Sequence, residues 1–205
     1  MPLFYQHNIN DATKLAVWHI TESEDFFLTK APLQKEISHP HKRLQHLAGR
    51  YLLEILEEGF PFHLIEISDA KKPLLSGSEF HFSVSHCGDY AAAIVSKNKL
   101  VGIDVELITP KIERVKNKFL SENEIDILPE NSTKYLTLFW SAKEAMFKWY
   151  GKGEIDFKKN LVIDKLSFGE ESGFINAHFE KEKRKELTIL FNFLNNLCLA
   201  WISQN

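Results

Sequence analysis

Three carboxylates and one lysine in the middle of the chain are the residues whose types and spacing could do chemistry. Asp104 and Glu106 are two residues apart, and Glu144 and Lys148 are four residues apart further along the chain. Carboxylate oxygens suit Mg²⁺, which usually completes its shell with water and substrate phosphates. The three carboxylates are therefore candidate metal ligands, and Lys148 is a candidate phosphate-binding cation.

The first pair of carboxylates stands on an expected strand. An apolar, partly β-branched run at 90–96 and an extended run at 100–107, joined by a short polar turn, predict a β-hairpin. Residues two apart on a strand project from the same face, so Asp104 and Glu106 would point together. Gly102 has no side chain and would let a ligand or another backbone approach closely.

The second pair stands on an expected helix. From about residue 132, apolar residues recur at three- and four-residue spacing, and Gly151 and Gly153 end the pattern. Glu144 and Lys148 would then lie one turn apart on one face. If that face meets the strand, Glu144 becomes a third oxygen ligand and Lys148 lies beside the metal.

Ordinary structural explanations compete with each motif. Ser141 and Glu144 have the spacing of a helix capping box, and Glu144 with Lys148 matches an exposed i,i+4 ion pair. Asp104 and Glu106 alone could be the polar face of a half-buried strand. A capping box gives no reason for an acidic strand upstream, so the presence of both motifs favours a functional site.

The order and spacing of these motifs resemble the 4′-phosphopantetheinyl transferases. The similarity lies in Val-Gly-Ile-Asp-Val-Glu at 101–106, Phe-Leu-Ser-x-x-Glu at 119–124, Phe-Trp-Ser-Ala-Lys-Glu-Ala-Met-Phe-Lys at 139–148 and Gly-Lys-Gly at 151–153. With 205 residues, the chain is similar to the longer, monomeric surfactin-synthetase-activator type. The resemblance implies a Mg²⁺-dependent enzyme that transfers the phosphopantetheine arm of coenzyme A to a serine of an apo acyl carrier protein or peptidyl carrier domain. The other product would be adenosine 3′,5′-bisphosphate.

The resemblance also implies roles for single residues. Glu144 and Lys148 would be catalytic, and Asp104, Glu106 and Glu144 would bind Mg²⁺; Glu144 could be a ligand, the general base for the serine, or both. The longer enzymes carry a Gly-Lys-Pro-like turn and a short Ser-His strand, which 71–73, with lysine in place of the glycine, and 82–86 match. The chain has nine glycines but no Walker-type or Gly-x-Gly-x-x-Gly loop, so side-chain cations must bind the phosphates. The expected coenzyme A contacts are Arg43, Arg50, Lys72, Ser85, His86 and Lys148.

Three of the residues near these motifs also have structural explanations. Arg50 could lie on a solvated helix face, and His86 could make a structural hydrogen bond at a strand end. Cys87 follows His86 without a recognisable Cys/His pattern, so it is interpreted as a small strand residue rather than a nucleophile.

The expected fold is α+β, with two similar lobes related by a pseudo-twofold axis, each a long helix packed on antiparallel strands. A weak internal sequence repeat, in which 47–53 is similar to 141–147, agrees with the family's two-lobed architecture. Lobe 1–100 would bind most of coenzyme A, and lobe 101–205 would hold Mg²⁺ and the pyrophosphate. The charged segment 180–186 is expected to be a solvated turn between two strands and not a binding site.

Composition narrows the possible classes. The net charge of −3 argues against a nucleic-acid partner and so weakens one alternative function, that of a metal-dependent nuclease. Such nucleases usually have the acid and the lysine two residues apart on a strand, whereas Glu144 and Lys148 are four apart on an expected helix. The start lacks a basic segment and no stretch approaches membrane-spanning length, so no membrane partner is expected. Two cysteines give no disulfide framework, which predicts a cytoplasmic protein.

A second alternative is a coenzyme A or carrier-protein binding module that lost turnover. Every expected carboxylate and the lysine are present, so the residues give this alternative no support. Carrier proteins of this class are usually acidic along their recognition helix, and a basic docking surface would complement them. The candidates for that surface are Lys111, Arg114, Lys116 and Lys118.

Overall fold

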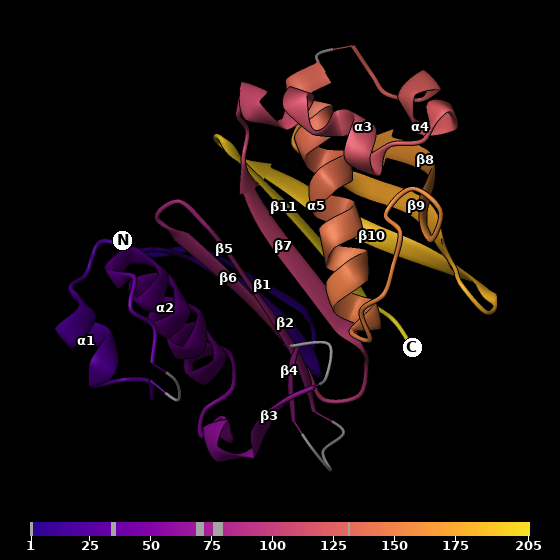
Figure 1. The fold of residues 1–205 in the computed structure, drawn as a ribbon. Helices are drawn as coiled ribbons and strands as arrows, with labels where there is room; N and C mark the ends of the chain where they lie inside the picture. The colour runs from indigo at the N-terminus through magenta and orange to yellow at the C-terminus, as the bar shows by residue number, and fades with distance from the viewer. Residues whose placement is uncertain (1, 34–35, 69–71, 76–79, 131) are drawn as a thin grey trace.

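Two antiparallel sheets, each with a long helix packed on one face, make up the protein in a computed structural model that describes residues 2–33, 36–68, 72–75, 80–130 and 132–205 (Figure 1). The first sheet has the strand order β1-β2-β6-β5 and the second has the order β7-β11-β10-β9-β8. A two-stranded sheet, β3-β4, is not hydrogen-bonded to either but packs on the core between α2 and the first sheet. The predicted α+β class with antiparallel strands is confirmed.

The bounds of the elements follow in chain order. They are β1 (Leu3–Asn10), β2 (Thr13–His19), α1 (Glu24–Leu28), α2 (Pro40–Leu56), η1 (Phe62–Leu64), β3 (Ile65–Ile67), β4 (Pro73–Leu75), β5 (His81–Cys87), β6 (Tyr90–Ser96), β7 (Val101–Leu107), η2 (Pro110–Arg114), α3 (Lys116–Phe119), α4 (Glu122–Asp126), α5 (Ser132–Tyr150), β8 (Leu161–Phe168), β9 (Ser172–Glu180), β10 (Arg184–Leu194) and β11 (Leu197–Ser203).

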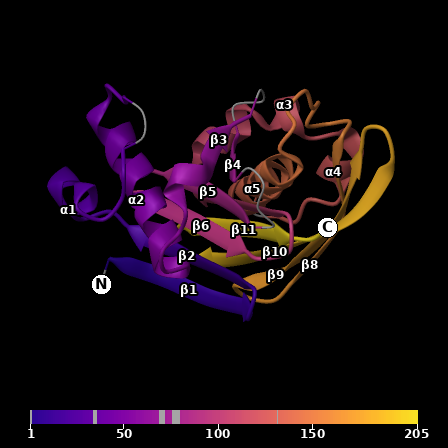
Figure 2. The same ribbon diagram turned by 90° about the horizontal axis from the view of Figure 1, so that it is seen from below.

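The alternation of side chains along the strands sorts the apolar residues into three cores. On β7, Ile103 and Val105 pack against the first sheet, and on β11 Leu199 does the same. The next residue of β11, Ala200, faces α5 instead, because successive strand residues point to opposite faces. With the core between α2 and the first sheet, the layers run α2, first sheet, second sheet, α5 (Figure 2). The two sheets use residues 3–96 and 101–203 respectively, while the division into two lobes with separate roles stays a prediction.

The predicted hairpin between 90–96 and 100–107 is wrong. Both stretches are strands, but β6 already pairs with β2 on one edge and with β5 on the other. A strand has only two hydrogen-bonding edges, so β7 cannot join β6 and instead pairs with β11 in the second sheet. The segment 97–100 therefore carries the chain from one sheet to the other.

Helix α5 approaches β7 unusually closely, and Gly102 makes this possible. A methyl group at position 102 would lie 2.8 Å from the amide nitrogen of Trp149 and closer still to the carbonyl oxygen of Ala145. The prediction that another backbone comes close to Gly102 is confirmed. At the end of α5, Gly151 has a φ of 70° and its amide donates to the carbonyl of Phe147, so the helix ends where the glycines predicted.

Within the described residues, no helix has the length and apolar character needed to cross a membrane.

Candidate active site

Asp104 is the centre of the candidate site. Its carboxylate is only 3% exposed and accepts three side-chain hydrogen bonds. Lys148 Nζ and Ser85 Oγ lie 2.8 and 2.7 Å from Oδ1, and Ser141 Oγ lies 2.6 Å from Oδ2. The donors come from β5 and α5, so the expected meeting of the acidic strand with the helix is present. Charge-assisted bonds of this kind fix the orientation of a carboxylate.

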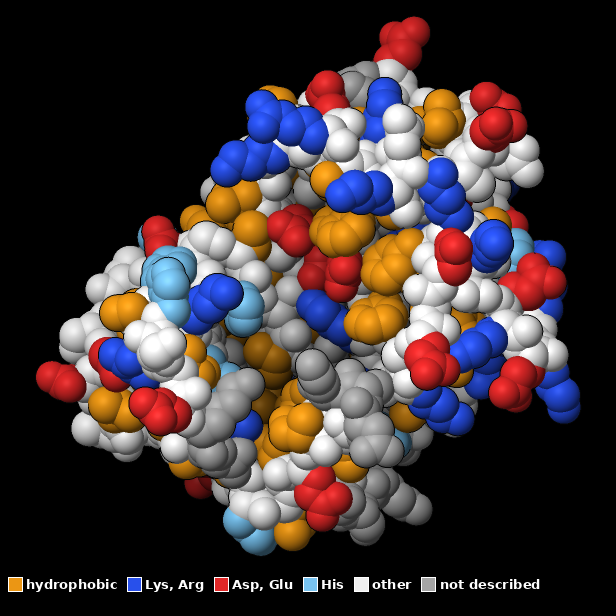
Figure 3. Space-filling view, viewed as in Figure 1, with side chains coloured by type: hydrophobic (Ala, Val, Ile, Leu, Met, Phe, Trp, Pro, Cys, Tyr) orange, Lys and Arg blue, Asp and Glu red, His pale blue; other side chains and the backbone are white. Residues whose placement is uncertain are grey.

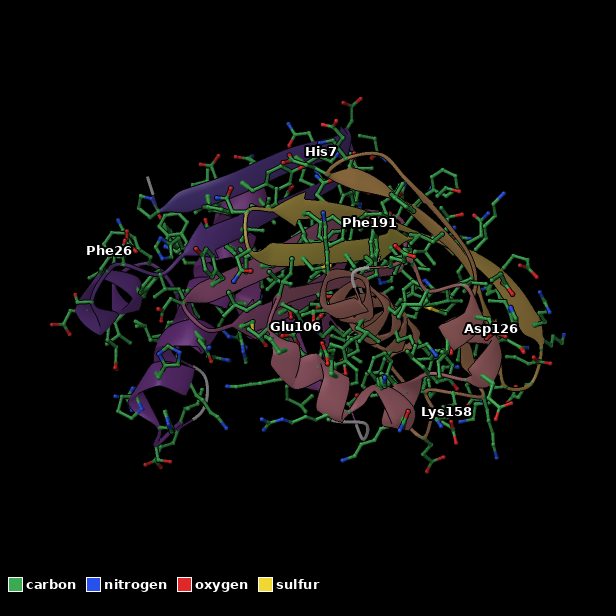
Figure 4. All side chains as sticks on the ribbon, turned by 90° about the horizontal axis from the view of Figure 1, so that it is seen from above. His7, Phe26, Glu106, Asp126, Lys158 and Phe191 are labelled. Atoms are coloured by element: carbon green, nitrogen blue, oxygen red, sulfur yellow. The ribbon has the colours of Figure 1, made fainter. Side chains whose placement is uncertain are left out.

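Glu106 lies beside Asp104 on the same face of β7 and is held by the indole of Trp140. Trp140 Nε1 donates to Glu106 Oε1 over 3.2 Å. Burial raises the pKa of Glu106, and the negative charge of Asp104 adds to this, while hydrogen bonds from Cys87 and Trp140 oppose it. Glu106 is half-buried, and in the view from above it lies near the middle of the molecule, whereas Phe26 lies at the edge (Figure 4).

Glu144 has the most perturbed carboxylate of the three. Burial raises the pKa of Glu144 to about 7; the charges of Asp104 and Glu106 also raise it, and Lys148 opposes them. A base titrating near neutrality suits proton transfer at physiological pH. Ser141, Glu144 and Lys148 are spaced i, i+3 and i+7 on α5, and they therefore share one helix face.

The three carboxylates fit a divalent cation by their chemistry. Burial and the negative charge of Asp104 raise the pKa values of both Glu106 and Glu144, and a hard cation would relieve that repulsion. In the part of the chain that the structure describes, however, no three His, Cys, Asp or Glu side chains are already gathered closely enough to hold a metal. The set Asp104, Glu106 and Glu144 therefore stays a prediction.

A buried ion pair supports the helix behind the site. Lys143 and Glu124 are both fully buried, with Lys143 Nζ 2.7 Å from Glu124 Oε1. Lys143 also donates to the carbonyls of Phe119 and Phe157 over 2.7 and 2.8 Å, which ties α5 to two neighbouring segments. The same Glu124 closes a capping box with Ser121 at the start of α4. The capping-box explanation for Ser141 is wrong, because Ser141 lies in the middle of α5 and donates to Asp104.

A cavity of about 200 Å³ opens beside Lys148 and carries a second lysine. Lys72 lines it, and its ammonium donates to the carbonyl oxygen of Lys148. Burial, together with the positive charge of Lys148, lowers the pKa of Lys72 to about 8. Lys71, the departure from the Gly-Lys-Pro pattern, lies outside the described residues. Two adjacent cations at one cavity are suited to a diphosphate.

A neighbouring cavity of about 140 Å³ is lined by Arg50, His46 and His86. Arg50 is 7% exposed, so its interpretation as part of a solvated helix face is wrong. Its Nε donates to His46 Nε2 over 3.0 Å, whereas no described residue accepts a hydrogen bond from its buried Nη1. His86 is itself exposed, yet the crowded cavity wall around its ring lowers its pKa, and the charge of Lys148 adds to this. A buried guanidinium with an unused donor at a cavity is an anion-binding arrangement.

Two of the expected coenzyme A contacts are engaged elsewhere. Arg43 forms an ion pair with Glu24 over 2.6 Å and donates to the carbonyl of Ile37, and it does not line the cavity of Arg50. Ser85 donates to Asp104, so its hydroxyl faces the carboxylates. These positions give no support to the predicted contacts of Arg43 and Ser85 with coenzyme A.

A third cavity, of about 530 Å³, lies on the opposite side of the carboxylates. Glu106, Trp140 and Cys87 form its inner wall, and Lys111 and Ile112 belong to its rim. Burial raises the pKa of the Cys87 thiol to about 12, which agrees with its interpretation as a structural residue. The space-filling view shows acidic side chains gathered in a hollow with hydrophobic and histidine side chains around it (Figure 3).

Three supporting residues were absent from the predicted site although a signal for each exists in the sequence. Ser141 shares a helix face with Glu144, and Trp140 is one turn from the same glutamate. His46 precedes Arg50 by one helical turn. A search for residues three or four positions from Glu144 and Arg50, which lie on the same helix face, would have found all three.

The chain belongs to the 4′-phosphopantetheinyl transferase superfamily, whose family model matches residues 100–200, about half of the chain. This region holds β7, α5 and all three carboxylates.

Individual relatives agree with this assignment. The chain is 34% identical over 120 residues to a 4′-phosphopantetheinyl transferase of Bacillus subtilis, covering 52% of this chain and 53% of that protein. It is 32% identical over 113 residues to enterobactin synthase component D of Salmonella typhi, covering 52% and 47%. It is 30% identical over 124 residues to the 4′-phosphopantetheinyl transferase gsp of Aneurinibacillus migulanus, covering 58% and 51%. The chain thus spans about half the length of the curated relatives it matches.

Proposed function

We propose that this protein transfers 4′-phosphopantetheine from coenzyme A to a serine of an apo acyl carrier protein or peptidyl carrier domain and releases adenosine 3′,5′-bisphosphate. The observation that carries the proposal is that Lys148 lines a cationic cavity and is bonded to Asp104, while Glu106, two residues along the same strand, lines a larger cavity. A transfer between two substrates needs two approaches to one reacting centre. The superfamily match over 100–200 supports the same reaction class.

The cationic side fits the donor. Lys72 and Lys148 line one cavity and would share a pyrophosphate, and Arg50 with His86 would bind the 3′-phosphate in the adjoining cavity. The unused donor of Arg50 supports this assignment, because a buried guanidinium group without an acceptor is costly and a phosphate oxygen would satisfy it. Phosphate recognition then needs no glycine-rich loop.

The carboxylates fit the reaction. In the transfer, the serine oxygen forms a bond to the phosphorus on the pantetheine side, and the bond from that phosphorus to the bridging oxygen breaks. Glu144 would take the serine proton, and its raised pKa keeps it basic enough to do so near pH 7. Lys148 would stabilise negative charge on the phosphoryl oxygens.

We also propose that Mg²⁺ binds Asp104, Glu106 and Glu144. The support is the donor set, three hard oxygen groups that repel one another in a region with little water. When bound, the ion would neutralise charge on the pyrophosphate and orient it. Lys148 and Ser141 would keep Asp104 fixed whether or not the ion is bound.

The larger cavity fits the approach of the acceptor. Its rim includes Lys111, and Arg114, Lys116 and Lys118 are exposed on the adjoining η2 and α3. Ile112 adds an apolar contact. This combination complements an acidic, amphipathic helix such as a carrier would present.

Mass spectrometry tests the proposal directly. The protein is incubated with coenzyme A, Mg²⁺ and a panel of apo carriers, and each carrier is weighed; the expected result is the mass gain of one phosphopantetheine on at least one carrier. The variants Asp104→Asn and Glu144→Gln should abolish that gain, whereas Lys165→Gln, an exposed change on β8, should not. No gain on any carrier would refute the transferase, and tight coenzyme A binding without a gain would favour a binding module. DNA cleavage by the same preparation would favour the nuclease.

A further inference from the structure

A basic groove lies beyond the candidate active site, at the end of α5. Its volume is about 460 Å³, and it lies between α5 and the β9–β10 hairpin, which reaches away from the body of the second sheet (Figure 1). The basic groove is defined by Leu100, Trp149, Tyr150, Lys152, Phe179 and 181–185.

The basic groove is continuous with the donor side of the site. It shares Tyr150 and Lys152 with a further cavity of about 290 Å³. That cavity in turn shares Lys72 and Gly151 with the cavity beside Lys148. Three adjoining cavities, each with at least one lysine in its lining, thus lead from the reacting centre to the hairpin.

Charge in the basic groove is net positive. Among the described residues that line it, Glu182 is the one acid, against the cations Lys152, Lys181, Lys183, Arg184 and Lys185. Arg184 is paired with Glu186 over 2.7 Å, so the four lysines carry the excess charge. The hairpin lysines are not simply extended into water: Lys185 Nζ lies 5.2 Å from the ring centroid of Trp149, and Lys181 Nζ lies 5.7 Å from that of Tyr150. Cation–π contacts hold both ammonium groups at the wall of the groove.

The floor of the basic groove decides what kind of anion fits. Leu100 is 37% exposed there, and the aromatic rings of Tyr150 and Phe179 line the same space. An apolar floor beneath a cationic rim complements a protein segment with one acidic and one apolar face. A double-stranded nucleic acid would bring a charged backbone but no apolar face, and the net charge of −3 of the chain argues against nucleic acid as the partner.

We propose that the basic groove docks an acidic, amphipathic segment of the protein that carries the acceptor serine, as a second contact separate from the cavity beside Glu106. The proposal rests on the proposed function, because it takes the acceptor protein as the partner. It revises the interpretation of 180–186 as only a solvated turn: the turn between β9 and β10 is present, and its side chains also form one wall of a groove.

A matched pair of double variants tests the proposal. The double variant Lys183→Glu/Lys185→Glu reverses two charges of the basic groove, and the control Lys30→Glu/Lys165→Glu reverses two exposed charges outside it. Both change the net charge equally, and all four residues are exposed, so folding should be preserved. The first probe is a fluorescent amphipathic helical peptide with Glu on one face and Leu on the other. A peptide with Lys in place of Glu is the control for charge.

The groove variant should bind the acidic peptide about tenfold or more weakly, and the control should bind it like the wild type. In the transfer assay, the KM for the apo acceptor should rise in the groove variant while the KM for coenzyme A and the kcat stay unchanged. Equal peptide binding by both variants, an unchanged acceptor KM, or equally tight binding of a single-stranded oligonucleotide in the groove would overturn the proposal. Failure of the proposed function would look different, because the wild type itself would then add no mass to any acceptor.

Discussion

Gly102→Ala should damage both the stability and the activity of the protein, because this position sets the distance between α5 and β7. The added methyl group would lie 2.8 Å from Trp149 N and 3.0 Å from the carbonyl carbon of Ala145. Relaxed contacts of this kind are roughly 3.5 Å or longer, so the helix must move by about 1 Å. Overpacking of this kind typically costs about 1–3 kcal/mol.

The same movement reaches the site through Lys148. Lys148 Nζ is 2.8 Å from Asp104 Oδ1, and it lies on the helix that must shift. A misplacement of about 1 Å is enough to reduce an enzyme's rate by about 100-fold. We therefore expect a loss of about 1–3 kcal/mol in the free energy of unfolding and a fall of about two orders of magnitude in the transfer rate.

Urea unfolding and the carrier mass assay measure the two effects. The matched control is Gly169→Ala, because a methyl group there would meet nothing closer than Ser172 O at 3.7 Å, an ordinary contact. If Gly102→Ala unfolds and reacts like the Gly169→Ala control, the close approach of α5 to β7 is not what positions the site, and the reasoning is refuted.

Three further substitutions test other parts of the site. Because the pKa of Glu144 is raised from 4.5 to about 7, its contribution to stability is present below pH 4.5 and lost as the pH rises through 7. Without metal, Glu144→Gln should therefore be more stable than the wild type at pH 8, by at most about 3 kcal/mol, and similar at pH 4; urea unfolding in EDTA that shows no pH-dependent difference would contradict this. Arg50→Met should raise the KM for coenzyme A by about tenfold or more but leave that for 3′-dephospho-coenzyme A nearly unchanged, and equal effects on both would argue against a 3′-phosphate contact. Lys143→Met should destabilise the fold by about 3–5 kcal/mol because it leaves Glu124 buried and unpaired. The double variant Lys143→Met/Glu124→Gln should recover part of that loss, because it removes the unpaired charge. Urea unfolding of both variants measures the difference, and equal stabilities would show that the ion pair is not responsible.

Local rules predicted those parts of the site that depend on local geometry. The period of two along β7 put Asp104 and Glu106 on one face, and helical spacing put Glu144 and Lys148 on another. Gly102 signalled the close approach that brings the two faces together. Each of these predictions needed only residues within one element, and each is confirmed.

Predictions that depended on partners distant in the sequence were less successful. The hairpin between β6 and β7 failed because β2 occupies an edge of β6, and nothing near residue 95 indicates that pairing. The burial of Arg50 depends on the cavity wall formed by β5, and Arg43 is drawn to Glu24 on the short helix α1. A charged residue on a helix reveals its spacing but not which neighbour will cover it.

The candidate site stands where the two sheets meet, and this position has a physical reason. Among the described strands, none pairs with β7 on the edge facing β5, so the amides of β7 there need other acceptors. Side chains of β5 supply them: Ile103 N donates to Ser83 Oγ over 3.2 Å, and Leu107 N donates to Cys87 Sγ over 3.4 Å. Between these two, Ser85 donates to Asp104, so the same row of small β5 side chains both joins the sheets and orients the central carboxylate. A continuous backbone ladder would have joined the sheets equally well, but it would have left no side-chain donor aimed at Asp104 and no opening for cavities on either side of it.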